Sequence, residues 1–516
     1  LRKVEAIQTM AQLLNPKTAI RNTVGNVGFA AMENISGVVG AGIDAAMGAV
    51  TGKRTKVMPS LQTQLKGFKQ GWKHGLEDAL LGIDTSGMVT KFDLPRGRVF
   101  RKGVLGEAEK LLSVELRATD RAFYQGAYEE SLRSQMLAAG VDRPTEEMKN
   151  IAHLDGLYKT FQDENHLTKL FTKLKNGLNL GYEHGLGSYV IKYPRTPANL
   201  LARGIDYSPA GFMKVIFEAG KPAFKHDFDQ KKFVEAFSRA LVGSTALFGT
   251  GALLQRAGVL TGAPVEDRDL AELNRQQGFG EYRINVTALK RLLMGDPATK
   301  PQTGDTIISY DWFQPNAISI AVGADIEANK GSGKGLVGSL LNAFATGVNA
   351  FAEQPVVQGI DTLFSGQDGA FSDGLIKVLQ GVPSSYVPTL LNQVRQLVDN
   401  QKRETYDPTM KIALNKAQAK IPFLASKLPA KHGTLGQPLE DYQDGSNNMF
   451  NVFFNPAFKN TYNPSPEVKK ATNILEQIGA TKQIPRKADK SITVSGNKFV
   501  LTGPEYAEYQ RLLGTY

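Results

Sequence analysis

Glycine inside helical patterns is the feature that most limits how this chain can fold. The sequence contains 52 glycines among 516 residues, against a usual share of roughly 7%, and many of them interrupt runs that otherwise have helical spacing. Because glycine lacks a Cβ atom, such helices either approach one another closely or bend. A hydrophobic content of 41% is enough for ordinary cores. We therefore expect a mainly α protein with closely packed helices.

The longest glycine-rich run covers residues 23–52. It consists of Gly, Ala, Val and Ile with few polar residues, and its only charges are Glu33 and Asp44. Small residues at this spacing let two backbones meet, as in membrane helix pairs, whereas two carboxylates are costly in a lipid-facing helix. Two interpretations stay open: a membrane-active or oligomer-core segment, and a helix pair packed inside a water-soluble protein.

Positive charge is concentrated at the start of the chain. Residues 1–75 contain ten Lys and Arg against three acids, and the whole chain has a net charge of +11. This excess favours an anionic partner, which can be nucleic acid, phospholipid or an acidic protein surface. The chain begins with Leu1 rather than Met, so we expect a fragment or a processed product.

A basic amphipathic helix is predicted over residues 61–80. Large apolar residues recur there at helical spacing, with lysines between them: Leu61, Leu65, Phe68, Trp72, Leu76 and Leu80. Such a helix can lie on an anionic membrane or on a polyanion. The alternative is a surface helix whose apolar stripe docks onto the rest of the protein. The candidate DNA- or lipid-contacting residues are Lys53, Arg54, Lys56, Lys66, Lys69, Trp72 and Lys73.

Catalytic chemistry has little support in the sequence. The chain has no cysteine, and its six histidines lack metal-binding spacing, so we predict no catalytic residues, no metal site and no cofactor. A long helical pattern over residues 105–139 stops at Gly140. Inside it, Glu130 and Ser131 match the Glu-Ser pair of lytic transglycosylases, whose further signature is absent. We therefore expect a protein that is not an enzyme.

Prolines in the middle of the chain predict a rigid structural joint, formed by Pro194, Thr196, Pro197 and Pro209. Proline biases the residue before it away from helix. We expect Thr196 to cap a helix and Pro197 to take its first position. This joint is then expected to lead into an apolar helix that ends near residue 262.

Two uncharged runs raise the question of membrane insertion. Residues 240–255, at about 1.5 Å each, fall short of a hydrocarbon core of roughly 30 Å, so by themselves they predict a buried core helix. Residues 335–352 are longer but contain polar side chains. In an oligomer both runs could line or cross a membrane as part of a conduit.

Short β elements complete the predicted architecture. Residues 282–286 and 306–310 have strand composition. Residues 491–501 predict a hairpin, followed by a capping box at Thr502 and a last helix with Pro504 in its first turn. We predict a mainly α, extended, multi-lobed helical protein with a small β insertion and a C-terminal β-hairpin.

Five segments are expected along the chain. Residues 1–140 form a basic helical region with the amphipathic and long helices, and residues 141–265 a helical core with the proline-rich joint and the apolar helix. Residues 266–330 form the small β-containing insertion, and residues 331–404 glycine-rich apolar helices. Residues 405–516 form a proline-punctuated C-terminal arm with the terminal hairpin and helix.

Several motifs, taken in order, resemble one group of bacteriophage proteins. They are residues 193–199 (YPRTPAN), 207–211 (YSPAG), 307–315 (IISYDWFQP) and 450–458 (FNVFFNPAF). Together with the closing residues 500–509 they resemble large phage proteins of the polyvalent type, which are internal virion or ejection proteins. The resemblance spans roughly residues 15–516, and it carries over no catalytic residue because these motifs are architectural.

The resemblance implies a virion protein that is ejected with the genome and forms a ring or conduit for DNA across the host cell envelope. The expected partners are further copies of the chain, other ejection, portal or tail proteins, double-stranded DNA bound without sequence preference, and the host inner membrane. The expected location is the virion interior, and after infection the host envelope. Two alternatives stay open: an inner-core or portal-associated structural protein that is not ejected, and a peptidoglycan-cleaving virion enzyme.

Overall fold

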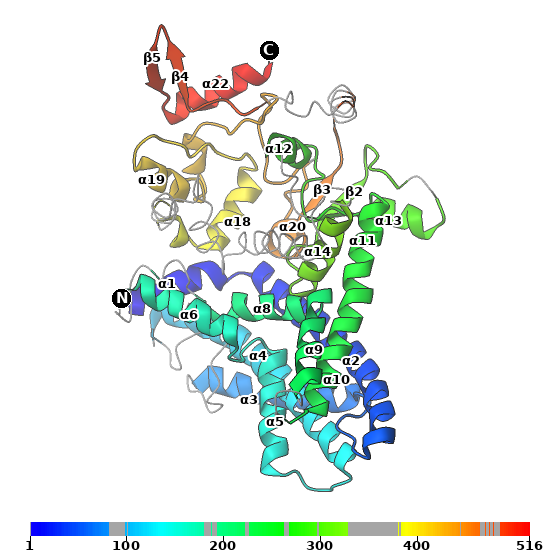
Figure 1. Cartoon of the computed structure of the whole chain (residues 1–516). Coiled ribbons are helices and arrows are strands. Elements are labelled where there is room, and N and C mark those ends of the chain that lie inside the picture. Colours follow the sequence, from blue (N-terminus) through cyan, green and yellow to red (C-terminus); the bar gives the residue numbers. More distant parts are fainter. Residues whose placement is uncertain are drawn as a thin grey trace.

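The chain folds into a mainly helical molecule with two small sheets, as predicted (Figure 1). The computed structural model describes residues 2–81, 99–179, 193–221, 227–262, 268–296, 299–328, 383–464 and 486–515, apart from residues 101, 297, 298 and 444, together with a few single positions between these ranges. Helices α1 to α11 form one part of the molecule, and the C-terminal segments and the sheets form the other (Figure 1).

The helices have the following bounds: α1 Arg2–Leu13, α2 Pro16–Thr51, α3 Leu61–Leu81, α4 Gly103–Ala139, α5 Glu146–Lys159, α6 His166–Leu178, α8 Arg195–Asp206, α9 Phe212–Gly220, α10 Gln230–Val242, α11 Gly249–Arg256, α12 Arg268–Gln276, α13 Val286–Leu293, α14 Asn316–Ala328, α18 Thr389–Val398, α19 Lys411–Gln418, α20 Met449–Phe453 and α22 Gly503–Thr515. Short turns of other helix types cover Pro209–Gly211, Gly243–Phe248 and Ala425–Lys427. The strands are β1 Arg283–Asn285, β2 Thr306–Ser309, β3 Lys459–Thr461, β4 Ser491–Val494 and β5 Asn497–Val500.

The glycine-rich run at residues 23–52 lies in α2, which is packed against the protein along one face. Asn15 caps the helix, Pro16 takes its first position, and Gly52 ends it with a φ of 70°. Ser36 Oγ donates to Ser238 Oγ on α10 at 3.1 Å. One face of this run thus forms a packed helix pair with α10, and both of its carboxylates are buried. A role of its outer face in a membrane or an oligomer stays a prediction.

The two carboxylates of α2 are held by cations from other parts of the chain. Glu33 Oε1 accepts from Arg239 Nε at 2.8 Å and from the Tyr207 hydroxyl at 2.7 Å. Asp44 Oδ2 accepts from Arg54 Nε at 2.9 Å. A charge in a low-dielectric interior is stable only with such partners. These ion pairs therefore fix α2 against α10 and against the loop that follows α2.

The main hydrophobic core lies where α2, α8, α10 and α14 meet. Phe29 and Tyr207 are buried there with their rings edge to face, 5.8 Å between centroids. Ile318 and Val322 of α14 pack into the same cluster. The buried core helix predicted at residues 240–255 is only partly buried, because Val242 and Leu247 enter this cluster whereas Leu253 is 68% exposed. It is the second half of one continuous helix, Gln230–Arg256, which contains a π turn at Gly243–Phe248.

The three-stranded sheet contains both strands predicted for the β insertion. β1 and β2 are antiparallel, with Ile284 opposite Ile308. β2 also pairs with β3, where Ile307 lies opposite Asn460. The sequence did not predict β3, because a three-residue strand carries too little pattern to distinguish it from a loop.

The C-terminal hairpin and the last helix are as predicted. β4 and β5 are antiparallel, and Ser495 and Gly496 form the two-residue turn with φ values of 50° and 80°. The backbone N–H and the hydroxyl of Thr502 both donate to the Glu505 carboxylate at 2.8 Å at the start of α22. The long helix α4 also ends where predicted, at Gly140 with a φ of 66°. The uncharged run at residues 335–352 lies outside the described residues.

Candidate functional site

Helix α3 contacts α4 through a row of glycines. Gly67, Gly71 and Gly75 recur every four residues and are buried. A Cβ atom on Gly71 would lie 2.7 Å from Gln125 Cβ and 2.9 Å from the Cα of Ala122, so the two backbones touch. The facing residues of α4 are also small and have the same spacing: Ala118, Ala122 and Gly126. This small-residue seam is the close helix packing that the glycine content predicts.

The seam decides which side chains of α3 are turned outward. Because glycines fill the contact with α4, the large apolar residues lie beside it, and they stay exposed: Leu61 64%, Leu65 60%, Trp72 41% and Leu80 46%. Phe68 is half-buried and packs edge to face on Phe123, 5.2 Å between ring centroids. The alternative that this stripe docks onto the protein is therefore wrong for most of its length.

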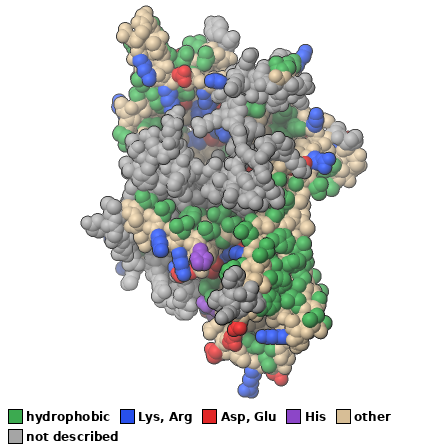
Figure 2. Space-filling view, viewed as in Figure 1, with side chains coloured by type: hydrophobic (Ala, Val, Ile, Leu, Met, Phe, Trp, Pro, Cys, Tyr) green, Lys and Arg blue, Asp and Glu red, His purple; other side chains and the backbone are tan. Residues whose placement is uncertain are grey.

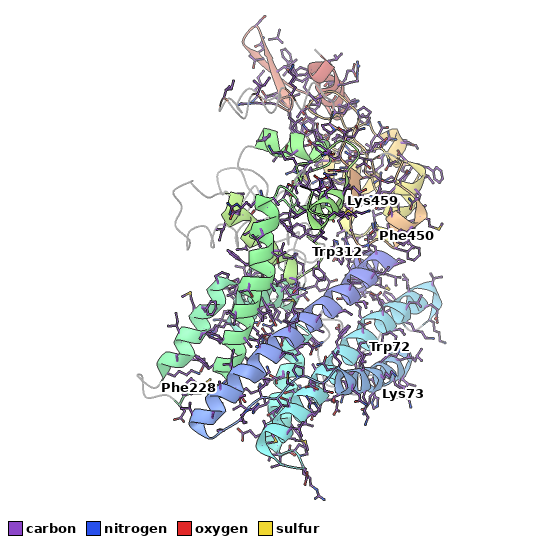
Figure 3. All side chains as sticks on the ribbon, turned by 90° about the vertical axis from the view of Figure 1, so that its right-hand side faces the viewer. Trp72, Lys73, Phe228, Trp312, Phe450 and Lys459 are labelled. Carbon is purple, nitrogen blue, oxygen red and sulfur yellow. The ribbon has the colours of Figure 1, made fainter. Side chains whose placement is uncertain are left out.

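Three lysines follow one edge of the exposed stripe. Lys66, Lys69 and Lys73 are exposed, and among the described residues no carboxylate lies within ion-pair distance of them. Trp72 and Lys73 lie at the margin of the molecule, on the side away from Phe228 (Figure 3). A surface hollow of about 630 Å³ at the N-terminal half of α3 is lined by α3 and the C-terminal part of α4 and includes Lys66. α3 thus presents a continuous apolar stripe with free positive charge beside it, which we call the α3 stripe.

The three basic residues before α3 are placed differently. Lys53 is exposed, whereas Arg54 is paired with Asp44. Lys56 Nζ lies 3.5 Å from Glu235 Oε1 on α10, and burial lowers the pKa of Lys56. Arg54 and Lys56 therefore already have counter-ions inside the protein, so of this group only Lys53 offers its charge to a partner.

The prolines of the predicted joint lie at two helix starts. Pro194 is the residue before α8, so that helix begins two residues earlier than expected, and Thr196 and Pro197 are buried in its first turn. The prediction that Thr196 caps the helix is wrong. Proline is tolerated throughout a first turn, because the backbone N–H it removes has no partner there. Pro209 begins a short turn capped by the Ser208 hydroxyl.

The joint leads into α9, not directly into the long apolar helix. α9 exposes Met213, Ile216 and Phe217, all at 70% or more. Figure 2 shows hydrophobic side chains gathered over α9 and the neighbouring helix Gln230–Arg256. The sequence did not predict this surface, because a nine-residue apolar helix is interpreted as part of the core unless its neighbours are known. We call it the α9 patch.

The helix Gln230–Arg256 is, among the described residues, the one that is long and apolar enough to cross a membrane. Its 27 residues suffice by length and composition, and 33% of its most apolar window is buried in the protein. Its first half carries Lys231, Glu235 and Arg239 in ion pairs within the protein. Membrane crossing would have to break these pairs.

Glu130, the residue considered for sugar chemistry, is a buried structural group. Both of its carboxylate oxygens accept from Arg133, at 2.6 and 3.0 Å. It borders a cavity of about 40 Å³, which is too small for a sugar ring. A general acid needs room beside it for its substrate, and this cavity does not provide that room. The described residues contain no cluster of three His, Asp or Glu that could hold a metal ion.

Comparison with known proteins identifies no relative. No family model matches the chain, and no curated protein and no solved structure is similar to it. The α3 stripe and the α9 patch are thus the features from which a function can be argued.

Proposed function

We propose that this protein is a non-enzymatic phage virion protein that binds an anionic membrane surface through α3 and helps DNA cross the host cell envelope after ejection with the genome. The phage context rests on the motif resemblance described above. The membrane contact rests on one observation: the apolar stripe of α3 is exposed beside three lysines without counter-ions.

The composition of the α3 stripe matches an anionic lipid surface. Burying a Leu-sized side chain away from water contributes about 1.5 to 3 kcal/mol, and each Lys near an anionic leaflet about 1 kcal/mol. Trp72 adds a ring of the kind that prefers the headgroup level. A helix of this kind lies in the plane of the interface and does not span the membrane. No conformational change of α3 is required, because its outward face is already apolar.

Flotation with liposomes tests the membrane contact. We expect the full chain to float with vesicles that contain 30% phosphatidylglycerol and to stay in the aqueous fraction with pure phosphatidylcholine. Changing Lys66, Lys69 and Lys73 together to Glu should reduce the floating fraction at least tenfold, because the charge beside the stripe is reversed. Equal flotation of this variant and the wild type would overturn the proposal.

A matched variant controls for total charge. Lys411, Lys427 and Lys498 are exposed lysines in the C-terminal part of the chain, away from α3. Changing these three to Glu alters the net charge by the same amount and should leave flotation unchanged. A second variant, Leu61→Ser with Leu65→Ser, removes apolar area and keeps the charge. It should weaken flotation on the same anionic vesicles.

The α9 patch supports the proposal that several copies assemble. Met213, Ile216 and Phe217 form an exposed apolar surface on α9, which packs against α10 through Phe212 and Phe237. Exposed patches of large apolar side chains are typical of surfaces that another protein covers. Phe228, at the margin of this patch, and Trp72 of α3 lie on opposite sides of the view in Figure 3. A copy bound at α9 would thus leave the α3 stripe free for lipid.

Particles before and after genome release distinguish ejection from permanent residence. We expect the protein to be present in intact virions and to be lost from emptied ones. We also expect to recover it in the envelope fraction of infected cells. Retention in emptied particles would favour the alternative of an inner-core or portal-associated structural protein. Clearing of peptidoglycan by the purified chain in a zymogram would instead favour the enzyme.

A further inference from the structure

A cavity with two cationic side chains in its wall lies between the first turns of α2 and the C-terminal part of the chain. Its volume is about 230 Å³. Two cations of α2, Lys17 and Arg21, line it together with Trp312, Gln314, Gln393 and Tyr442. No Asp or Glu is among its lining residues. The cavity is therefore positively charged, and the residues that form it come from segments hundreds of positions apart.

Lys17 is buried and Arg21 is half-buried, and neither side chain takes part in an ion pair within the described part of the chain. Lys17 Nζ donates to the Tyr442 hydroxyl at 3.0 Å and to the Asn451 carbonyl at 2.8 Å, and Arg21 Nε donates to the Pro456 carbonyl at 2.8 Å. Among the described residues, no carboxylate lies within ion-pair distance of either cation. The carboxylate that attracts Arg21 electrostatically is that of Asp311, which lines the adjoining cavity together with Arg21.

This arrangement differs from that of three arginines elsewhere in the described part of the chain. Arg203 is paired with Asp163, Arg239 with Glu33, and Arg395 with Asp441. Buried charges in proteins are normally paired in this way, because desolvation of a lone charge is expensive. Burial, and then the charge of Arg21 one helical turn away, lower the pKa of Lys17 to about 7. An anion between the two side chains would remove this cost.

Two residues that line the cavity, Gln393 and Gln314, also have buried amide oxygens without hydrogen-bond partners. The Gln393 side chain is 4% exposed, and its Nε2 donates to the Val452 carbonyl at 2.9 Å, but its Oε1 has no hydrogen bond. Gln314 is similar: its Nε2 donates to the Asp311 carbonyl at 2.7 Å, and its Oε1 has no partner. Buried acceptors of this kind are normally satisfied. They call for a ligand that donates O–H groups.

We propose that this cavity binds a small organic phosphate with free hydroxyl groups, of the size of a pentose phosphate. The phosphate lies between Lys17 and Arg21, and the hydroxyls donate to Gln393 and Gln314. Arg is well suited to such an anion, because its planar group donates two parallel hydrogen bonds. A cavity of about 230 Å³ admits a sugar phosphate but no DNA duplex. The site is independent of α3 and of the proposed membrane contact.

Calorimetric titration of the full chain tests the site. The probes are ribose 5-phosphate, ribose and inorganic phosphate. We expect ribose 5-phosphate to bind at least tenfold more tightly than phosphate, because only the sugar satisfies the two amide oxygens. Arg21→Gln should weaken ribose 5-phosphate at least tenfold. Gln393→Met should weaken ribose 5-phosphate and leave phosphate unchanged. Lys411→Gln, at an exposed position of α19, is the control and should bind all probes as the wild type does.

The pH dependence of sulfate binding gives a second, independent readout. Sulfate keeps its charge between pH 6 and 8.5, so a change in affinity reports on the protein. The charged and titratable groups around Lys17 are Arg21 on the same helix, Tyr442 opposite, and Asp311 beyond Arg21. Burial raises the pKa of Tyr442 to about 12, so it stays neutral here. Wild-type affinity should therefore fall severalfold towards pH 8.5, whereas that of Lys17→Arg should stay constant.

Three outcomes would overturn the proposal. The first is the absence of binding of ribose 5-phosphate by the wild type. The second is equal binding of ribose 5-phosphate by Arg21→Gln and the wild type. The third is equal affinity for ribose 5-phosphate and inorganic phosphate, which would exclude a sugar phosphate as the ligand. If Arg21→Gln does not fold, as judged by circular dichroism, the comparison of wild type and Lys17→Arg with sulfate decides whether an anion binds between these two side chains.

Discussion

At the scale of single residues, the glycines of α3 carry the most stringent packing. A Cβ atom on Gly71 would meet Gln125 and the backbone of Ala122 at less than 3 Å, so α3 and α4 would have to separate. We expect Gly71→Ala to lower the free energy of unfolding by about 1 to 3 kcal/mol, measured by urea denaturation. Gly42→Ala is the matched control. Gly42 is also helical but has open space around it, so alanine there should stabilise by up to about 1 kcal/mol.

Lys17 predicts an unusual dependence of stability on pH. Its pKa in the folded protein is about 7, below its ordinary value of 10.5. Between these values the unfolded chain keeps a proton that the folded chain releases, so the free energy of unfolding rises with pH. We expect Lys17→Met to be more stable than the wild type at pH 7. The difference between their free energies of unfolding, called the gap, should narrow by about 1 kcal/mol per pH unit towards pH 10. The Tyr442 hydroxyl already donates to the Asn451 carbonyl at 3.4 Å, so this carbonyl keeps a donor when the lysine is removed.

Urea denaturation at pH 7, 8.5 and 10 measures this gap for Lys17→Met. Lys66→Met, at an exposed position of α3, is the control for the loss of a lysine. A gap of constant size over this pH range would contradict the assignment of the effect to Lys17.

At the scale of elements, the ion pairs of Glu33 join α2 to α10. Burial by itself would raise the pKa of Glu33, but the charges of Arg239 and Lys159 and hydrogen bonds from Arg239 and Tyr207 outweigh it and hold the pKa at about 2. The stability from this group is therefore complete above its ordinary pKa of 4.5 and is lost as the pH falls from there towards 2. The pairing of α2 with α10 should accordingly weaken in acid.

Removal of Arg239 tests this junction. Arg239→Met leaves the carboxylate of Glu33 buried without its main partner, and we expect a loss of about 3 to 5 kcal/mol in the free energy of unfolding. The double variant Glu33→Leu with Arg239→Met removes both charges and should lose less than the single variant. Guanidinium denaturation at pH 7 measures both. A double variant less stable than Arg239→Met would show that the pair has another role.

The sequence predicted the positions of helices more reliably than it predicted which face of each helix is buried. The period of Leu61, Leu65 and Trp72 indicates a helix correctly, because that period is a local property. Which face is buried depends on the partner, and small residues on α4 select the glycine face of α3. The strand β3 and the cavity at Lys17 were not predictable for a related reason. Their contacts join residues more than 150 positions apart, and no local pattern records such a contact.

At the scale of the whole molecule, the α9 patch predicts self-association. We expect Met213→Glu to raise the dissociation constant of the assembly about tenfold or more, because a charge would be buried between copies. Met294→Glu is the matched control, since Met294, at the C-terminal end of α13, is 74% exposed and Met213 is 73% exposed. Sedimentation velocity over a range of concentrations measures both. Equal association of the two variants would place the contact elsewhere.

The seam between α3 and α4 has a consequence for how this protein tolerates change. In most surface helices the large apolar side chains are the ones that cannot vary, and the glycines are replaceable. In α3 the order is reversed, because Gly67, Gly71 and Gly75 support the fold and Leu61, Leu65 and Trp72 do not. A complete substitution scan of α3, selected first for folding and then for lipid binding, should therefore return two sets of intolerant positions that do not overlap.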